Sequence, residues 1–277
     1  MSNTKPQFID LDKIFESKAP GVYKKTPRFA INYLKRKVHV DELNDILDRY
    51  ADCDGVDFMT SVVDYFDLKL NVIGLENIPN EGRFLFASNH PLGGLDGICL
   101  SAIIGTKYDK KIRYQVNDLL LSIRNLQSIF LPINKIGKQS KEIVEKINNA
   151  FDSDNQIITF PAGLCSRKQK GQIRDLEWKK NFIQKAIESK RDIVPIYFDG
   201  TNSNFFYRFA NIRKAIGLKF NIEMVFLPDE MFKNKGKTFN IVFGEPIPYT
   251  FFDKSKNAMQ WAEYMKEKSY SLSKMIK

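Results

Sequence analysis

The spacing of apolar residues along the chain changes at about residue 67. Before it, apolar residues recur at the spacing of a helix face: Leu43, Ile46, Leu47 and Tyr50, and then Phe58, Val62, Val63 and Phe66. After it, apolar residues alternate with polar ones, which is the period of a strand: Leu68, Leu70 and Val72. We therefore expect an N-terminal helical segment over residues 1–66 and a separate domain over residues 67–277.

Strand and helix patterns then follow one another to the end of the chain. Strands are predicted over residues 83–88, 112–116, 156–160, 193–198, 220–226 and 239–243. Helices are predicted over residues 97–104, 138–150, 175–189 and 257–274. This alternation favours an α/β fold in which helices flank a central mixed sheet.

Composition narrows the class of protein and of partner. With 277 residues and 43% hydrophobic positions, the chain suits one large domain, or one domain with a small appendage. The net charge of +10 favours an anionic partner, such as a phospholipid surface, a nucleic acid or an acidic carrier, without choosing among them. The three cysteines, Cys53, Cys99 and Cys165, lack the spacing of metal ligands and are typical of reduced thiols in a cytosol.

The sequence also bears on where the protein works. Its first residues are polar and lack an apolar signal core, and no stretch reaches the roughly 20 apolar residues of a membrane span. The most apolar segment, Leu119 to Ile133, is interrupted by polar residues and by Pro132. We expect a cytoplasmic protein that does not cross the bilayer but can lie against it.

The strongest candidate for catalysis is His90, one of only two histidines. It follows the apolar run 84–87 and opens a glycine-rich turn that ends near Asp96. Histidine has the side-chain pKa closest to neutrality, so this pattern suits a general base oriented by a carboxylate. The alternative is a buried histidine satisfied by a turn carbonyl, with Asp96 capping the next helix.

Three further stretches place polar residues after apolar runs. Residues 157–167 end a strand in a Pro161 and Gly163 turn followed by a basic run that begins at Arg167, and such a turn can hold an anion. The alternative there is a solvated basic loop. Residues 130–135 end in Asn134 and Lys135, and residues 193–200 contain a buried-type strand; sheet core and loop are the alternatives for both.

Together, these stretches resemble the four motifs of the glycerolipid and lysophospholipid acyltransferase superfamily (PlsC-like). The resemblance covers about residues 68–250. The matching residues, in motif order, are Asn89, His90 and Asp96, then Asn134 and Lys135, then Phe160, Pro161, Gly163 and Arg167, then Val194 and Pro195. The resemblance implies the α/β fold of these acyltransferases.

Two departures from the family pattern point to one branch of it. Five residues, not four, separate His90 from Asp96, and Ala162 stands where the family usually has a glutamate associated with the glycerol-phosphate acceptor. Together with residues 202–207, these departures resemble the hemolysin-like branch. That branch includes O-acyltransferases of lyso-ornithine and lyso-glycine lipids, whose acceptor is the hydroxyl of an N-linked 3-hydroxyacyl chain.

The resemblance implies a mechanism and a set of site residues. His90 would deprotonate the acceptor hydroxyl, Asp96 would orient His90, and the alkoxide would attack an acyl thioester on acyl carrier protein or coenzyme A. The substrate-binding set would be Asn89, Asn134, Lys135, Phe160, Pro161, Gly163 and Arg167. No bound cofactor and no metal are expected, and Cys99 and Cys165 are interpreted as buried residues rather than acyl carriers.

Two other functions stay open from the sequence. One is a lysophosphatidate acyltransferase, and the other is a non-catalytic lipid- or nucleic-acid-binding protein on the same scaffold. Against nucleic acid, the aromatic residues fall mostly at core spacings rather than among lysines. Membrane contact is expected through the basic N-terminal helices, with Tyr23–Lys25 and Lys35–Lys37, and through the Leu119–Leu131 segment. The alternatives are a solvated face and a core helix.

Overall fold

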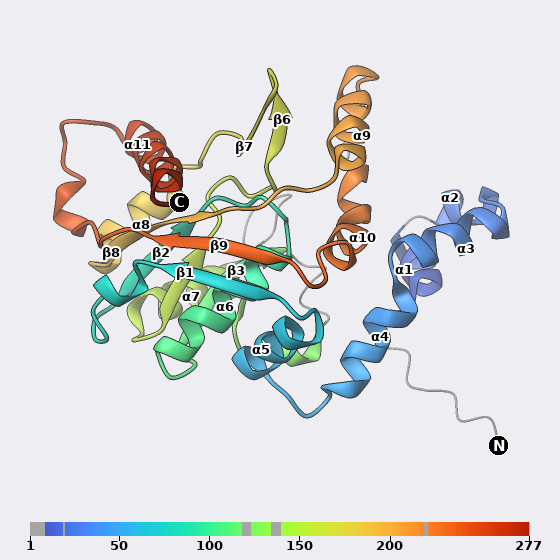
Figure 1. Cartoon of the computed structure of the whole chain (residues 1–277), viewed down its shortest axis with the longest axis horizontal. Helices are drawn as coiled ribbons and strands as arrows, with labels where there is room; N and C mark the ends of the chain where they lie inside the picture. The colour runs from blue at the N-terminus through green and yellow to red at the C-terminus, as the bar shows by residue number, and fades with distance from the viewer. Residues whose placement is uncertain (1–8, 19, 118–122, 134–139, 219–220, 277) are drawn as a thin grey trace.

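A computed structural model describes residues 9–18, 20–117, 123–133, 140–218 and 221–276. Within these residues, seven strands form one sheet in the order β1-β9-β8-β2-β5-β3-β4 (Figure 1). The strands are β1 (Lys69–Ile73), β2 (Phe84–Ser88), β3 (Ile112–Asn117), β4 (Phe130–Ile133), β5 (Gln156–Thr159), β8 (Asp192–Phe198) and β9 (Thr238–Phe243). All neighbouring pairs are parallel except β8 and β9. The predicted mixed sheet is therefore confirmed.

The central strand β2 explains why the sheet is covered on both faces. All five of its residues are buried, so its sequence is continuously apolar up to Ser88 instead of alternating. Phe84 and Phe86 pack into one core with residues of α5 (Gly55–Tyr65) and α6 (Leu95–Lys107). Leu85 and Ala87 pack into a second core with three other helices: α7 (Lys141–Asp152), α8 (Asn181–Ser189) and α11 (Ala258–Ser271).

The N-terminal region is helical, as predicted. Its helices are α1 (Leu11–Lys18), α2 (Pro20–Lys25), α3 (Arg28–Lys37) and α4 (Val40–Arg49), which lie beside the sheet at the right of Figure 1. The next helix, α5, contributes Val56, Phe58, Met59 and Val62 to the core under the sheet, which also includes Ile46 and Leu47 of α4. The division of the chain at residue 67 stays a prediction.

The strand predicted over residues 220–226 was wrong. Its described part is the 3₁₀-helix η4 (Ile222–Phe226), followed by α10 (Leu227–Phe232). The alternation was misleading because burial runs against it: Ile222 is 42% exposed, whereas Glu223 is fully buried. The helix α9 (Asn204–Ala215), which precedes η4 in the chain, was not predicted.

Other elements begin or end differently from the prediction. The helix predicted over 175–189 begins only at Asn181. The predicted basic loop is a hairpin of β6 (Arg167–Gln169) and β7 (Gln172–Arg174). The described part of the Leu119–Ile133 segment is the 3₁₀-helix η3 (Arg124–Leu126) and β4, not a core helix. No helix in the described ranges has both the length and the apolar character to cross a membrane.

The contact between α5 and α6 leads to a test of this packing. A Cβ added at Gly105 of α6 would lie 2.5 and 2.6 Å from the two γ-carbons of Val56. We expect Gly105→Ala to lower the free energy of unfolding by about 1–3 kcal/mol, because overpacking outweighs the gain of up to about 1 kcal/mol in helix propensity. Urea denaturation followed by circular dichroism measures the change.

Two variants control this prediction. Gly21 lies in helix α2, and a Cβ added there would have no atom within 4 Å, so Gly21→Ala should leave stability unchanged or slightly higher. Val56→Ala combined with Gly105→Ala should be more stable than the sum of the two single losses predicts. A Gly105→Ala protein as stable as the parent would contradict the packing of α5 on α6.

Candidate active site

The turn after β2 brings His90 and Asp96 together. Gly93 adopts a left-handed backbone with φ of 79°, which only glycine adopts at little cost, and the chain then enters α6 at Leu95. The reversal places the Nδ1 atom of His90 3.0 Å from Oδ2 of Asp96. The five-residue spacing between His90 and Asp96 therefore keeps the two side chains in contact.

The Asp96 carboxylate is fully buried and saturated with donors. Besides His90, it accepts hydrogen bonds from the backbone N–H groups of Leu92 (2.9 Å), Gly93 (3.3 Å) and Gly97 (2.9 Å). Burial alone would raise the pKa of Asp96, but the adjacent His90 and these hydrogen bonds outweigh it and hold the pKa below its usual value. An ionised Asp96 can only accept a hydrogen bond, so the His90 ring carries its proton on Nδ1. In a neutral ring the free lone pair is then on Nε2.

The His90 ring is positioned by the end of the neighbouring strand. Phe160 follows β5, which pairs with β2, and its ring stacks on the His90 ring with centroids 4.2 Å apart. The His90 side chain remains 15% exposed. The first and third predicted motifs thus meet because their strands are neighbours in the sheet.

The backbone of His90 is held by two residues that sequence reasoning missed. Ser166 donates its N–H to the His90 carbonyl (2.8 Å), and the His90 N–H points to the Asp175 carboxylate (3.2 Å). Asp175 also accepts hydrogen bonds from the Ser166 hydroxyl (2.6 Å) and from the indole of Trp178 (2.9 Å). Burial raises the pKa of Asp175, partly offset by these bonds. The available signal was an acidic residue directly after the basic run that ends at Arg174.

Asn89 binds the protein itself. Its amide nitrogen donates to the carbonyl of Phe198 (2.9 Å), and its amide oxygen accepts from the Phe198 N–H (2.7 Å). Asn89 is buried, and these bonds extend the pairing of β2 with β8 past the last residue of the strand. This residue, interpreted from the sequence as substrate-binding, anchors the start of the His90 turn.

The turn after Phe160 presents a cation to the surface. Pro161 is buried, whereas Gly163 is exposed and adopts a φ of 66°. A Cβ at Gly163 would lie 3.4 Å from the ammonium of Lys179, and the Lys179 N–H donates to the Pro161 carbonyl (3.0 Å). The sequence did not single out Lys179, because it lies in the stretch that was assigned to a helix.

Arg167 does not lie in a solvated loop. It is buried, and its guanidinium donates to Oε1 of the fully buried Glu223 (2.8 Å). Arg213 bonds the other oxygen of Glu223 (2.7 Å). The anion that Arg167 binds in this structure is therefore an internal carboxylate, which local sequence could not reveal.

The remaining predicted residues divide into three groups. Val194 and Pro195 lie in β8, paired with Phe86 and Ala87 of β2. Asn134 and Lys135 lie outside the described residues. Cys99 and Cys165 are buried, as interpreted, and burial raises the pKa of Cys165 to about 11 and that of Cys99 further.

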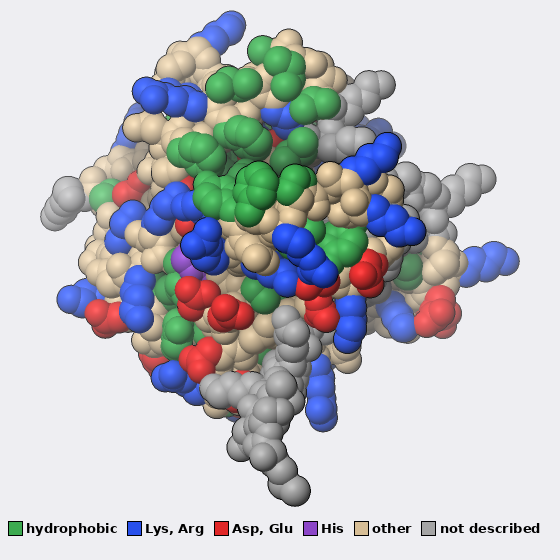
Figure 2. All heavy atoms as spheres, turned by 90° about the vertical axis from the view of Figure 1, so that its right-hand side faces the viewer, with side chains coloured by type: hydrophobic (Ala, Val, Ile, Leu, Met, Phe, Trp, Pro, Cys, Tyr) green, Lys and Arg blue, Asp and Glu red, His purple; other side chains and the backbone are tan. Residues whose placement is uncertain are grey.

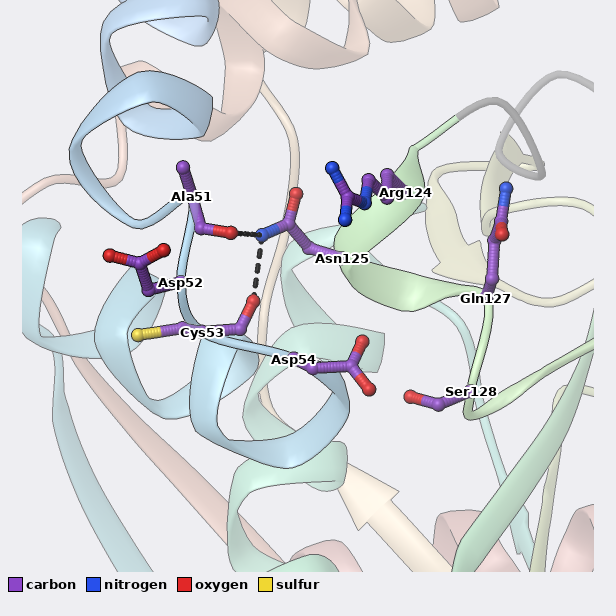
Figure 3. Close-up of a pocket in the computed structure, with 8 residues that line it drawn as sticks. All are labelled: Ala51, Asp52, Cys53, Asp54, Arg124, Asn125, Gln127 and Ser128. Atoms are coloured by element: carbon purple, nitrogen blue, oxygen red, sulfur yellow. Dashed lines mark hydrogen bonds between the residues drawn. The ribbon is translucent and has the colours of Figure 1, made fainter.

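A pocket of about 540 Å³ lies elsewhere, between the start of α5 and η3 (Figure 3). Asn125 is one of the lining residues and donates to the carbonyls of Ala51 (3.5 Å) and Cys53 (2.7 Å). None of the predicted site residues lines it. In the described part of the chain, no three or more His, Cys, Asp or Glu side chains are grouped to hold a metal ion. We therefore base the candidate site on His90 rather than on this pocket.

A family model described as "Acyltransferase" matches residues 13–277. The chain belongs to this acyltransferase family. It is 54% identical to the lyso-glycine lipid O-acyltransferase of Bacteroides thetaiotaomicron over 95% of this chain and 97% of that one. It is 51% identical to the enzyme of the same name from Phocaeicola vulgatus over 95% of each chain. Among solved structures, the 1-acyl-sn-glycerophosphate acyltransferase PlsC of Thermotoga maritima is similar, with a TM-score of 0.49 and 15% identity over 96% of this chain and 95% of that one.

The ion pair of Arg167 with Glu223 leads to a test of what Arg167 does. Removing one partner of a buried pair typically costs about 3–5 kcal/mol, and Arg213 retains part of the compensation. We expect Arg167→Met to lower the free energy of unfolding by about 2–4 kcal/mol. Arg167→Met combined with Glu223→Gln should recover most of this loss, because a neutral amide can still accept from Arg213. If Arg167 served the substrate instead, Arg167→Met would keep its stability and raise KM.

Proposed function

We propose that this acyltransferase moves a fatty acyl group from a thioester to the hydroxyl of a lyso-aminolipid, with lyso-glycine lipid as the acceptor. The observation that carries the proposal is the 3.0 Å contact between His90 Nδ1 and the buried Asp96 carboxylate. Two relatives more than half identical to the chain, each named a lyso-glycine lipid O-acyltransferase, support the choice of acceptor.

The His90–Asp96 pair suits general-base catalysis of this transfer. Nε2 of His90 takes the proton of the acceptor hydroxyl while the hydroxyl oxygen forms a bond to the thioester carbonyl carbon. The carbon–sulfur bond then breaks, and the departing thiolate receives the proton back from His90. Asp96 stabilises the positive ring that exists between these steps. A thioester is already activated, so the protein needs no serine or cysteine nucleophile.

Two features favour an acceptor without a phosphate group. Ala162 replaces the glutamate that the resembled family associates with the glycerol-phosphate acceptor, and Arg167 is paired with Glu223 instead of projecting as a free cation. A glycine head group instead offers one carboxylate, for which the exposed Lys179 beside Gly163 provides a cation. These features place lysophosphatidate second to lyso-glycine lipid as the candidate acceptor.

The donor and the location belong to the same proposal. Acyl carrier protein and coenzyme A are both anionic, which suits a chain of net charge +10. The lipid acceptor requires contact with a membrane, and we assign the enzyme to the cytoplasmic face as a peripheral protein. On α3, Phe29 and Tyr33 are exposed beside the Lys35–Lys37 cluster, which supports a contact through the N-terminal helices.

His90→Ala tests the mechanism. We expect kcat to fall by about 10²–10⁴-fold, the usual contribution of a general base, while thermal stability and vesicle binding persist. Acyl transfer is measured with a radiolabelled acyl thioester and lyso-glycine lipid. His39→Gln is the matched control, since the other histidine bonds Glu42 and Asp229 and should leave transfer unchanged. Undiminished transfer by His90→Ala would refute the mechanism and favour a non-catalytic lipid-binding protein.

A comparison of acceptors tests the substrate. Lyso-glycine lipid, lyso-ornithine lipid and lysophosphatidate are supplied in turn with the same acyl donor. We expect kcat/KM for lyso-glycine lipid to exceed that for lysophosphatidate by about 10–100-fold, because the Arg167 guanidinium is already paired with Glu223 and does not offer a doubly charged phosphate a free cation. A preference for lysophosphatidate would overturn the assignment while leaving the His90 mechanism intact.

A further inference from the structure

Apolar side chains are exposed on one outer face of the molecule, over α9 and η4. We call this surface the α9–η4 face. Its exposed large apolar residues are Phe205, Ile212, Ile216, Leu218, Ile222 and Val225. Ile212 and Ile216 are 59% and 66% exposed. Figure 2 views the side of the molecule that carries α9, α10 and the N-terminal helices, and it shows hydrophobic side chains gathered on the upper part of that side, with Lys and Arg side chains around them. Exposed apolar patches of this kind mark interaction sites.

The α9–η4 face rests on a firmly packed support. Phe206 and Tyr207 are buried with Cys165 in a small core on the inner side of α9, and the Ser203 hydroxyl caps the helix. Phe205 stacks on Phe209 (5.9 Å) and contacts Phe226 edge-on (5.4 Å). The inner side of α9 is thus packed against the protein, and the apolar residues on its outer side remain exposed to solvent.

The charges around the face are sorted by sign. Among the described residues 204–218 and 221–235, the three carboxylates Glu223, Asp229 and Glu230 are all buried. The exposed charged residues in these ranges are all cations: Arg208, Lys214 and Lys235, together with Lys233, which is paired with Asp229 and Glu230. Asn211 also donates to the Lys168 carbonyl (3.4 Å), which brings the basic β6–β7 hairpin beside α9. An apolar surface with a cationic border is complementary to an anionic lipid surface.

The same segment packs against the catalytic turn. A Cβ at Gly93 would lie 2.8 Å from Cδ1 of Leu227, the residue after η4, and the Cys165 sulfur lies 3.8 Å from that of Met224. The inner side of the η4 segment therefore contacts the turn that holds His90 and Asp96. A bilayer resting on its outer side would lie next to that turn.

We propose that the α9–η4 face docks the enzyme on an anionic bilayer and thereby sets the His90 turn against the lipid surface. The proposal rests on the proposed function, because a lyso-lipid acceptor has to be taken from a membrane. A second copy of this chain is a poor occupant, since its charge of +10 would meet the cationic border of the face. An acidic carrier protein would match the cations but would not require the exposed Ile212 and Ile216 at the C-terminal end of α9, a helix that projects from the sheet in Figure 1.

The test measures vesicle binding without turnover. The full chain is sedimented with phosphatidylcholine vesicles that contain or lack phosphatidylglycerol. We expect the parent to bind the anionic vesicles, and Ile212→Ser/Ile216→Ser to bind them about tenfold or more weakly, because two apolar side chains are lost from the contact. Arg208→Gln/Lys214→Gln should lose the preference for phosphatidylglycerol. Transfer to a short-chain, micellar acceptor should be unchanged in both variants.

Matched controls keep the outcome unambiguous. Val144→Ser/Ile187→Ser removes two apolar side chains of α7 and α8 that are 43% and 40% exposed, and it should bind vesicles like the parent. Parental binding by Ile212→Ser/Ile216→Ser overturns the docking proposal. The proposal is also overturned if the parent is a dimer that Ile212→Ser/Ile216→Ser dissociates, or if this variant loses only the binding of acyl carrier protein. His90→Ala should bind vesicles normally, so failure of the acyl-transfer proposal and failure of the docking proposal give different results.

Discussion

The buried carboxylate of Asp96 constrains everything around the proposed catalytic base. A carboxylate removed from water is tolerated only when donors replace the lost hydration, and here His90, Leu92, Gly93 and Gly97 supply them. Three of these donors are backbone N–H groups, two from the turn (Leu92 and Gly93) and one from the start of α6 (Gly97), so the chain must fold back on itself at Gly93. That reversal starts α6 and leaves the imidazole at the end of β2. The position of His90 therefore follows from the hydrogen bonds that the buried Asp96 carboxylate requires.

The sequence predicted the elements whose burial follows from local pattern. The strands that are buried on both faces, such as β2 and β8, were found within a residue or two because apolar runs bounded by Gly, Pro or polar residues are typical of central parallel strands. The segment 222–226 was misread because Glu223, not its apolar neighbours, is buried. Glu223 is buried because it pairs with Arg167, which is distant in the sequence, and with Arg213, which lies in α9. The spacing of apolar residues within 220–226 carries no information about these partners.

The candidate site divides in the same way. The His90–Asp96 contact could be predicted because both residues lie within one short turn whose glycines dictate its course. The surroundings of Asn89 and Arg167 could not, because their partners Phe198 and Glu223 are distant in the chain. Asp175 was missed for the same reason: its importance comes from holding the His90 backbone, a contact across 85 residues. Residues that act through the fold become visible only when the fold is known.

The segment that carries α9, η4 and α10 reverses the usual partition of side chains. It buries Glu223, Asp229 and Glu230 and exposes six large apolar residues. Each buried carboxylate needs partners, such as Arg167 and Arg213 for Glu223 or Ser203 and Lys233 for Glu230. Buried ion pairs are seldom more stabilising than apolar side chains of similar volume, so folding stability alone would favour the opposite arrangement. The reversal does have one physical effect that stability does not explain: it clears negative charge from the surface next to the His90 turn. A surface so prepared is suited to lipids that carry negative charge and fatty chains together.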